Sequence, residues 1–175
     1  RTSEFGWGLD SLINDKAYKL FGILNGVDYE EWSPAIDALI PANFDSDDLK
    51  GKALCKEALQ KAFNLPVRND VPLIGLVGRL AEQKGIALLS AAIWNLMEMD
   101  IQIVLLGAGE KWAEHFFSDV AAKYPAKFAT YIGYDNSVAH QIEAGSDMFL
   151  MPSLFEPCGL NQIYSLRYGT VPIVR

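Results

Sequence analysis

The sequence contains few of the residues that mark disulfide-stabilised or metal-binding domains. Only two cysteines occur among 175 residues, Cys55 and Cys158, and neither lies in a CxxC or Cys/His ligand spacing. This scarcity excludes a disulfide scaffold and a zinc site, and it indicates a reducing compartment. We therefore expect no metal ligand among the site residues.

Basic residues and long apolar runs are also scarce. Fifteen Lys and Arg stand against 22 Asp and Glu, so the formal net charge is −7. This balance argues against nucleic acid or an anionic membrane surface as the main partner, although a small anionic ligand is compatible with it. No run approaches the roughly 18 apolar residues of a membrane span, and no signal-peptide pattern is found. Neither a nucleic acid nor a membrane is therefore expected as a partner.

What the chain does contain is apolar material for a core. Half of its residues are hydrophobic and 21% are charged, which suits roughly one globular domain. Position 1 is not Met, and the last residues, TVPIVR, look like a buried strand that has been cut. These two features predict a piece of a longer protein.

From residue 71 onward, short apolar runs alternate with segments of helical period. The runs that predict strands are 71–78, 101–107, 128–133, 147–152 and 171–174. The segments that predict helices are 85–99, a segment with a face through Trp112, Phe116 and Val120, then 137–144 and 161–169. Continuous apolar strands separated by helices predict a parallel sheet covered on both faces. The fold class is therefore α/β, with right-handed crossovers.

The first 70 residues are less regular. KLFGIL (19–24) predicts a strand, and NGVD (25–28) predicts a turn because Asn and Gly tolerate positive φ. Residues 29–48 carry prolines and many carboxylates, and we interpret them as a connecting excursion. The stretch 49–65 predicts an amphipathic helix, and the acidic DSDD before it suits a helix N-terminus.

Glycines and polar side chains follow four of the predicted strands. In parallel sheets, ligands bind in the crevice outside the carboxyl ends of the strands, where loops and helix N-termini converge. Arg79 and Lys84 in the first loop suit a diphosphate, because Arg offers fork-shaped donors and Lys a point charge. Tyr134 offers a flat face to a base, and Glu156 can accept hydrogen bonds from sugar hydroxyls. The set predicts a nucleotide-sugar site.

Each of these residues also has a structural interpretation. Arg79 can pair with Glu82 on the surface, and Lys84 can be a solvated side chain at a helix start. Tyr134 can be a packing residue. Glu156 can cap the helix that follows it, although a carboxylate among apolar neighbours is costly without a partner.

Other candidate residues carry weaker signals. Gly107 and Gly109 fail the dinucleotide fingerprint, because Trp112 occupies the position of its third Gly. Cys158 is better interpreted as a small buried filler than as a nucleophile. His115 and His140 lie on predicted helices without a ligand partner at suitable spacing, which favours surface or packing roles.

Several motifs carry a family resemblance. GRLAEQKG (78–85), EPCGLNQ (156–162) and RYGTVPIV (167–174), in this order and spacing, closely resemble bacterial glycogen synthases and plant starch synthases. LNGVDYEEWSP (24–34) and TSEFGWGLD (2–10) fit the same family. The resemblance covers nearly the whole chain.

This resemblance implies the C-terminal half of a two-Rossmann, GT-B type glycosyltransferase. Residues 1–48 would be the end of an N-terminal domain with an interdomain segment, and 49–175 a nucleotide-sugar-binding domain truncated at its C-terminus. The family's N-terminal domain, with its Lys-x-Gly-Gly loop and catalytic-site His, does not occur in the chain, and neither does the Thr-Gly-Gly stretch expected after the last strand. We therefore expect the chain to be inactive by itself.

The resemblance also implies an activity. The donor would be ADP-glucose, and glucose would be added with retained anomeric configuration to the nonreducing end of an α-1,4-glucan, without a cofactor. Arg79 and Lys84 would hold the diphosphate, Tyr134 would stack on the adenine, and Asn25 would reach the sugar from the interdomain side. The residues lining the glucose and the distal phosphate would be Glu156, Cys158, Gly159 and Leu160.

Two alternatives stay open. One keeps the fold but uses UDP-glucose with a sucrose-type acceptor. The other is a noncatalytic nucleotide-binding or assembly module. No metal is expected in the ADP-glucose-dependent transferase, because Arg79 and Lys84 can neutralise the diphosphate charge. The expected location is the bacterial cytoplasm or the plastid stroma.

Overall fold

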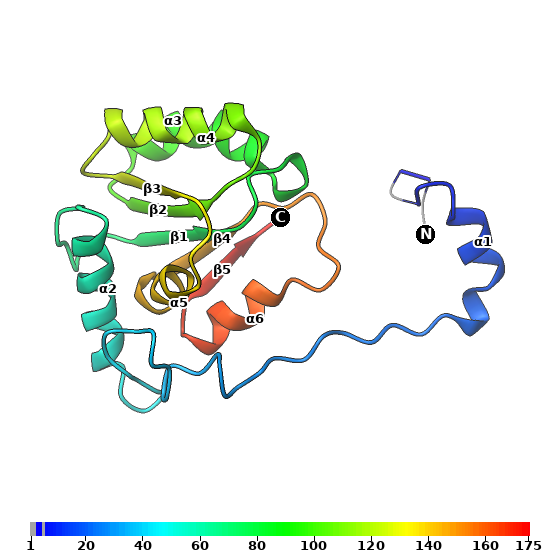
Figure 1. Cartoon of the computed structure of the whole chain (residues 1–175), viewed down its shortest axis with the longest axis horizontal. Coiled ribbons are helices and arrows are strands. Elements are labelled where there is room, and N and C mark those ends of the chain that lie inside the picture. The colour runs from blue at the N-terminus through cyan, green and yellow to red at the C-terminus, as the bar shows by residue number, and fades with distance from the viewer. Residues whose placement is uncertain (1–2, 5) are drawn as a thin grey trace.

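Five parallel strands form the centre of the computed structural model, which describes residues 3–4 and 6–175 (Figure 1). The strands are β1 (Leu73–Val77), β2 (Gln102–Gly107), β3 (Phe128–Ile132), β4 (Met148–Met151) and β5 (Val171–Val174). Their order across the sheet is β3-β2-β1-β4-β5, and all neighbouring pairs are parallel. The five strands lie within the runs predicted from the sequence, and the predicted α/β class is confirmed. Two residues of the family-like stretch 2–10, Thr2 and Phe5, lie outside the described residues.

Helices cover both faces of the sheet (Figure 1). On one face lie α3 (Ile86–Glu98) and α4 (Lys111–Lys123); on the other lie α2 (Lys50–Ala62), α5 (Asn136–Gly145) and α6 (Leu160–Arg167). The shorter helices are α1 (Asp10–Asp15), η1 (Ala17–Lys19) and η2 (Glu82–Lys84). Within the described part of the chain, no helix has the length and apolar character needed to cross a membrane.

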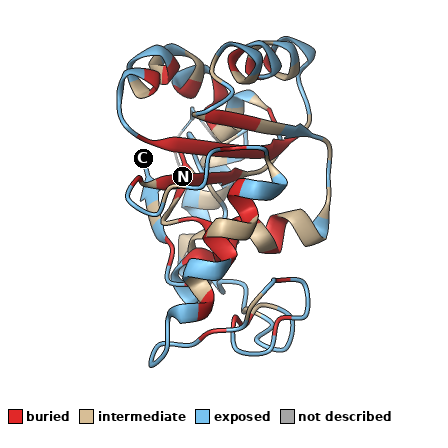
Figure 2. Cartoon of the chain, turned by 90° about the vertical axis from the view of Figure 1, so that its left-hand side faces the viewer, coloured by how far each residue is buried: buried red, intermediate tan, exposed pale blue. Residues whose placement is uncertain are grey.

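The central strands are buried, and so are parts of the helices packed on them (Figure 2). In α3, Ile86, Leu89 and Ile93 are buried and Leu96 is partly buried, as the helical period of this segment predicts. All six residues of β2 are buried, because helices pack on both sides of it. Burial on two faces explains why the strand sequences are continuously apolar rather than alternating.

The buried face of α4 includes Val120 as predicted but differs from the prediction at the other two positions. Its buried residues are Ala113, Phe117 and Val120, whereas Trp112 is exposed and Phe116 is only partly buried. A prediction from helical periodicity favours the helix face that carries the largest aromatic side chains as the buried one. Here the small side chain of Ala113 faces the core, and Trp112 points away from it.

The carboxyl ends of three strands are level, and this positions the loops that follow them. Val77 pairs with Leu106 in β2, and Gly107 pairs with Ile132 in β3. The loops after β1, β2 and β3 therefore leave the sheet at the same edge.

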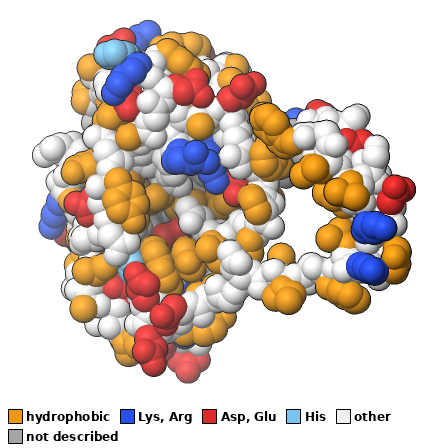
Figure 3. Space-filling view, turned by 45° about the vertical axis from the view of Figure 1, so that its right-hand side comes forward, with side chains coloured by type: hydrophobic (Ala, Val, Ile, Leu, Met, Phe, Trp, Pro, Cys, Tyr) orange, Lys and Arg blue, Asp and Glu red, His pale blue; other side chains and the backbone are white. Residues whose placement is uncertain are grey.

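An N-terminal arm, residues 6–28, stands off the main body (Figures 1 and 3). The strand predicted at 19–24 is wrong: Lys19 ends η1, and residues 20–28 run without helix or strand. A strand needs the backbone hydrogen bonds of a neighbouring strand, and the described chain offers none to this segment. The predicted turn at 25–28 is also not observed: the next turn after residue 20 begins only at Asp28, whose carbonyl accepts from the Trp32 amide at 2.8 Å.

Large hydrophobic side chains of this arm are exposed, and they are visible along it in Figure 3. They are Trp7, Leu9, Leu12, Tyr18, Leu20, Phe21, Ile23 and Leu24. Apolar surface of this extent on one segment is typical of a protein interaction site.

Residues 29–48 form turns without a helix or strand, as the interpretation of a connecting excursion predicts, but they are packed onto the body. Ile40 and Phe44 are buried in a cluster with Cys55, Ala144 and Tyr168. The excursion therefore has a small core of its own against α2, α5 and the end of α6.

The acidic stretch 45–48 leads directly into α2. Asp45 accepts from the backbone amides of Asp47 and Asp48, each at 2.9 Å, and Asp48 accepts from the Lys50 amide at 3.0 Å. Leu49, the N-cap residue, makes no side-chain cap. The carboxylate of Asp48 thus reaches the first amide of α2, and Asp45 orders the turn before it.

A buried polar junction joins α2 and α5 to the turn between α6 and β5. Lys52 Nζ donates to the carbonyl oxygens of Ala144 at 3.1 Å and Tyr168 at 2.9 Å, and to Thr170 Oγ1 at 2.9 Å. Burial lowers the pKa of Lys52 to about 8. Glu143 is buried nearby, and its Oε2 has no hydrogen-bond partner among the described residues. Burial raises the pKa of Glu143 well above its usual range, although the charge of Lys52 acts in the opposite direction.

Replacing Glu143 by glutamine is expected to change how stability depends on pH. The pKa of Glu143 is higher in the folded state than its ordinary value of 4.5, so the unfolded chain loses this proton first and the free energy of unfolding falls as the pH rises above that value. Glutamine does not titrate. We therefore expect the free energy of unfolding of the variant to rise relative to that of the wild type between about pH 5 and about pH 8. Urea denaturation at both pH values measures this difference, and a difference that is constant with pH would contradict the raised pKa.

Candidate functional site

A cavity of about 550 Å³ opens at the carboxyl edge of the sheet. Its walls are the loops that follow β1, β2, β3 and β4, together with the start of α6. The lining includes all eight residues singled out from the sequence, namely Asn25, Arg79, Lys84, Tyr134, Glu156, Cys158, Gly159 and Leu160. A volume of this size is typical of sites for small molecules.

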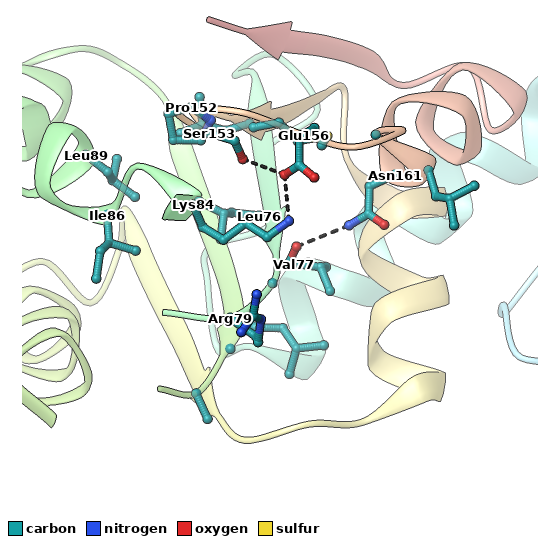
Figure 4. Close-up of a pocket in the computed structure, with 18 of the residues that line it drawn as sticks. Leu76, Val77, Arg79, Lys84, Ile86, Leu89, Pro152, Ser153, Glu156 and Asn161 are labelled. Atoms are coloured by element: carbon teal, nitrogen blue, oxygen red, sulfur yellow. Dashed lines mark hydrogen bonds and ion pairs between the residues drawn. The ribbon is translucent and has the colours of Figure 1, made fainter. Parts of the chain in front are cut away.

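Lys84 and Glu156 form an ion pair inside the cavity (Figure 4). Lys84 Nζ lies 2.6 Å from Glu156 Oε1, and Ser153 Oγ donates to the same oxygen at 2.7 Å. The side chains of Lys84 and Glu156 are 28% and 16% exposed, so both are partly shielded from water. The solvated Lys84 considered from the sequence is therefore not observed.

The contacts of Glu156 determine its protonation. Partial burial raises the pKa of Glu156, but hydrogen bonds from Lys84 and Ser153, with the positive charge of Arg79 nearby, outweigh it and leave the pKa below its usual value. Glu156 is therefore ionised near neutral pH. It can accept hydrogen bonds from hydroxyl groups, but it is not a proton donor at that pH.

Arg79 lies directly after β1, on the exposed side of the cavity. Its Nη2 donates to Gln83 Oε1 at 3.3 Å, so the structure places Gln83, and not Glu82, beside the guanidinium. Gln83 also joins the loop after β4: its carbonyl accepts from the Leu154 amide at 2.9 Å, and its Nε2 donates to the Phe155 carbonyl at 3.3 Å. The loops that carry Arg79 and Glu156 are thus linked through one glutamine.

Gly107 and Gly109 allow the loops after β1 and β2 to touch. A Cβ at Gly107 would lie 2.2 Å from the Gly78 carbonyl oxygen, and one at Gly109 would lie 2.4 Å from the Leu80 carbonyl oxygen. Leu80 and Gly109 form a parallel bridge beyond the ends of their strands. These glycines therefore serve close backbone approach, which agrees with the failure of the dinucleotide fingerprint.

Gly85 holds the turn that carries Lys84 against the loop after β4. Its φ is +74°, and a Cβ on it would lie 2.0 Å from the Pro152 carbonyl oxygen. Only glycine combines this left-handed conformation with such close contact to backbone. The distance between Lys84 and Glu156 is therefore set in part by Gly85.

Replacing Gly85 by alanine is expected to lower the free energy of unfolding by about 1–3 kcal/mol, because the left-handed conformation is strained for alanine and the Cβ must displace the backbone at Pro152. Gly78→Ala is the matched control, since a Cβ at Gly78 meets nothing within 4 Å. Chemical denaturation of both variants measures the effect. Equal stabilities would show that the contact between Gly85 and Pro152 is not tight in solution.

Tyr134 and Asn25 occupy exposed positions of the lining. Tyr134 follows β3 and is 84% exposed, so the packing role considered for it is not observed and its ring is accessible to a ligand. Asn25 belongs to the N-terminal arm, which crosses to the cavity from outside the sheet domain.

Glu156 does not cap the helix that follows it. The N-cap of α6 is Gly159, with φ of +75° and no side-chain cap. The chain instead lines the cavity wall at Cys158, Gly159 and Leu160, and Cys158 is partly buried. The start of α6 is therefore directed to the cavity without a competing side-chain acceptor at its N-cap.

Sequence reasoning missed three residues that organise the site. Ser153 donates to Glu156, Gln83 links the two loops, and Asn161 Nδ2 donates to the Val77 carbonyl at 3.2 Å, which ties α6 to the end of β1 (Figure 4). All three are uncharged and lie within or beside the motifs 78–85 and 156–162. Gln83 and Asn161 lie within these motifs and Ser153 lies shortly before the second, and this placement is the signal that was available.

A family model described as Glycosyl transferases group 1 matches residues 58–175. The chain belongs to this family. The matched range contains β1 to β5 and all residues of the cavity lining named above except Asn25.

Curated glycogen and starch synthases align with the chain over nearly its full length. Glycogen synthase 1 of Geobacter sulfurreducens is 59% identical over 175 residues, which are 100% of this chain and 35% of that protein. Glycogen synthase of Anaeromyxobacter sp. (strain Fw109-5) is 55% identical over 174 residues, 99% of this chain and 37% of the relative. Starch synthase 1, chloroplastic/amyloplastic, of Triticum aestivum is 49% identical over 173 residues, 99% of this chain and 27% of the relative. The predicted resemblance is confirmed, and the chain spans about a third of the length of these relatives.

A solved starch synthase structure shares the same architecture. The catalytic domain of Starch Synthase IV from Arabidopsis thaliana, bound to ADP and acarbose, matches with a TM-score of 0.92 and 39% identity over 99% of this chain and 36% of that one. WaaG, a glycosyltransferase of lipopolysaccharide biosynthesis, matches with a TM-score of 0.59 at 16% identity and shares the fold alone. The predicted GT-B type fold class is confirmed.

Proposed function

We propose that this chain supplies the donor-binding part of a retaining glucosyltransferase that transfers glucose from ADP-glucose to the nonreducing end of an α-1,4-glucan. The observation that carries the proposal is the convergence of Arg79, Lys84 and Glu156 on one cavity at the carboxyl edge of the sheet. The names of its relatives, glycogen synthase and starch synthase, support it, as does the ADP bound to the structural neighbour.

The proposal includes a division of the chain. Residues 1–48 would belong to the end of an N-terminal domain and an interdomain segment, and 49–175 would form the nucleotide-sugar-binding domain. The exposed hydrophobic side chains of the arm and the share of the relatives that the chain spans support this division. We call the full-length protein that contains this chain and that N-terminal domain the complete enzyme, and we place it in the bacterial cytoplasm or the plastid stroma, the latter on the name of the wheat relative.

In the proposed reaction, the bond between C1 of glucose and the distal phosphate oxygen breaks, and a bond forms between C1 and the acceptor hydroxyl oxygen. Negative charge develops on the departing ADP, so fixed cations stabilise the transition state more than the ground state. Lys84 Nζ has three donors, of which Glu156 Oε1 takes one, so two can reach phosphate oxygens. Arg79 adds a second cation on the exposed side.

Glu156 has an orienting role in this scheme. Its lowered pKa keeps it ionised, and neither of its contacts with Lys84 and Ser153 uses Oε2, which can accept from glucose hydroxyls. The acceptor approaches the face from which ADP leaves, and the leaving phosphate takes the acceptor proton. Tyr134, exposed at the cavity, stacks on the adenine.

Calorimetric titration of the chain with ADP-glucose, ADP and UDP-glucose tests the proposal. ADP-glucose and ADP are expected to bind, and UDP-glucose to bind more weakly. Tighter binding of UDP-glucose would favour a UDP-glucose-dependent transferase of the same fold.

Activity is tested with the complete enzyme. Glucan elongation from ADP-glucose is expected. Binding of ADP without elongation would instead identify a noncatalytic nucleotide-binding module.

A further inference from the structure

The outer side of α6 is covered by the excursion that follows the N-terminal arm. Ser165 is the only residue buried within α6 itself, so this helix has little core of its own. Residues 29–37 contact this outer side of α6. Ser33 Oγ accepts from Arg167 Nη2 at 3.2 Å, and the Arg167 guanidinium lies 5.3 Å from the centre of the Tyr29 ring.

Trp32 is the centre of a three-ring stack. Its ring centroid lies 3.7 Å from that of His140 at an interplanar angle of 19°, and 4.1 Å from that of Tyr164 at 2°. Two rings that are both nearly parallel to the indole, and both this close to its centre, must lie on opposite faces of it. Trp32 is therefore held between α5, which carries His140, and α6, which carries Tyr164.

Asp37 makes a second connection between the same two helices. Its Oδ2 lies 2.8 Å from His140 Nδ1 and accepts from the Tyr168 hydroxyl at 2.5 Å. Because a carboxylate is an acceptor, Nδ1 of His140 donates. Asp37 and His140 are 2% and 0% exposed at their side chains, and Tyr168 is fully buried, so water does not compete for these contacts. His140 thus has the packing role predicted for it, together with a hydrogen bond that sequence reasoning did not predict.

The two connections join a well-anchored helix to a weakly anchored one. Two residues of α5 are fully buried: Ile142 packs in the core cluster that contains strand residues, and Ala144 packs in the cluster with Ile40 and Phe44. The first residues of α6, Leu160 and Asn161, line the cavity, and the loop that carries Glu156 leads into them. The position of that cavity wall therefore depends on residues 29–37, which do not themselves line the cavity.

We propose that Trp32 and Asp37 are positioning residues for the donor cavity, which hold α6 and the loop 152–159 in place by clamping α6 to α5. The effect on donor binding rests on the function proposed above. The effect on the mobility of α6 does not, because it follows from the stack and the hydrogen bonds alone.

Hydrogen exchange of the chain without ligand tests the clamp itself. In Trp32→Ala, amides of α6 are expected to exchange roughly tenfold faster than in the wild type, since two stacked contacts are lost, while β1 and β2 keep their protection. Trp94→Ala is the matched control, because Trp94 is a partly exposed tryptophan on α3, on the opposite face of the sheet. Unchanged exchange of α6 in Trp32→Ala, or equal acceleration of α6 in Trp94→Ala, would overturn the proposal.

Titration of the same variants with ADP-glucose tests the consequence for the cavity. Trp32→Ala is expected to raise the Kd roughly tenfold, and Trp32→Phe, which keeps an aromatic ring in the stack, to restore most of the affinity. Trp94→Ala is expected to bind as the wild type does. A wild-type Kd in a folded Trp32→Ala would refute the positioning role.

The two measurements separate the two proposals. If the wild-type chain binds neither ADP-glucose nor ADP, the proposed function fails, while faster exchange of α6 in Trp32→Ala still supports the clamp. If the wild type binds and α6 exchanges normally in Trp32→Ala, the clamp fails and the proposed function stands.

Discussion

Replacing Lys84 by alanine in the complete enzyme is expected to reduce kcat by about 10²- to 10³-fold, the effect of removing one preorganised donor from a developing negative charge. Lys84 Nζ is held 2.6 Å from Glu156 Oε1 in the cavity, so under the proposed function it is a fixed cation at the diphosphate site. Its contribution grows as the anomeric bond breaks, and the KM for the glucan should change little. Steady-state kinetics with ADP-glucose and a glucan primer measure both constants.

Lys50→Ala is the matched control for this experiment. The side chain of Lys50 is 90% exposed at the start of α2 and pairs only loosely with Asp48, at 3.7 Å. We expect kinetic constants like those of the wild type for this variant. A kcat for Lys84→Ala within a few fold of the wild type would remove Lys84 from the mechanism.

The Lys84→Ala variant also reports on Glu156. Without Lys84, Glu156 loses the hydrogen bond that does most to lower its pKa. If Glu156 orients glucose and does not attack it, no covalent glucosyl adduct will form in the wild type or in Lys84→Ala. Detection of such an adduct on Glu156 by mass spectrometry would replace front-face transfer with a two-step mechanism.

Replacing Asp37 by alanine is expected to lower the free energy of unfolding by about 3–5 kcal/mol, as when one partner of a buried, hydrogen-bonded pair is removed. The loss arises because Asp37 Oδ2 accepts from both His140 and Tyr168 in a region closed to water. Both donors would be left buried and unpaired. Urea denaturation followed by circular dichroism gives the difference.

Asp119→Ala provides the comparison for Asp37→Ala. Asp119 is exposed on α4, so its removal is expected to change the free energy of unfolding by less than about 0.5 kcal/mol. A loss of less than about 1 kcal/mol in Asp37→Ala would mean that His140 and Tyr168 find other partners or reach water.

The fold class and the meeting of the site loops could be predicted from the sequence because both follow from local patterns. Continuous apolar runs separated by helical segments require a parallel sheet with two covered faces. Once the sheet is parallel, all loops after its strands share one edge, and Arg79, Lys84, Tyr134 and Glu156 must approach each other.

The wrong predictions have a common physical cause: the structure of these segments depends on residues far away in the chain. KLFGIL has the composition of a strand, but no described strand pairs with it. Phe116 has the size of a core residue, but the rotation of α4 on the sheet places Phe117 in the core instead.

By itself, then, the amino-acid order determined the layers of this protein and the edge at which its polar loops gather, because periodicity and chain direction are properties of neighbouring residues. Only the tertiary structure decided the partners of the charged and aromatic side chains. Glu156 pairs with Lys84, 72 residues away, and Asp37 pairs with His140, 103 residues away. Such pairs form because burial removes water as a competing partner, and which groups are buried together is decided by the packing of the whole chain.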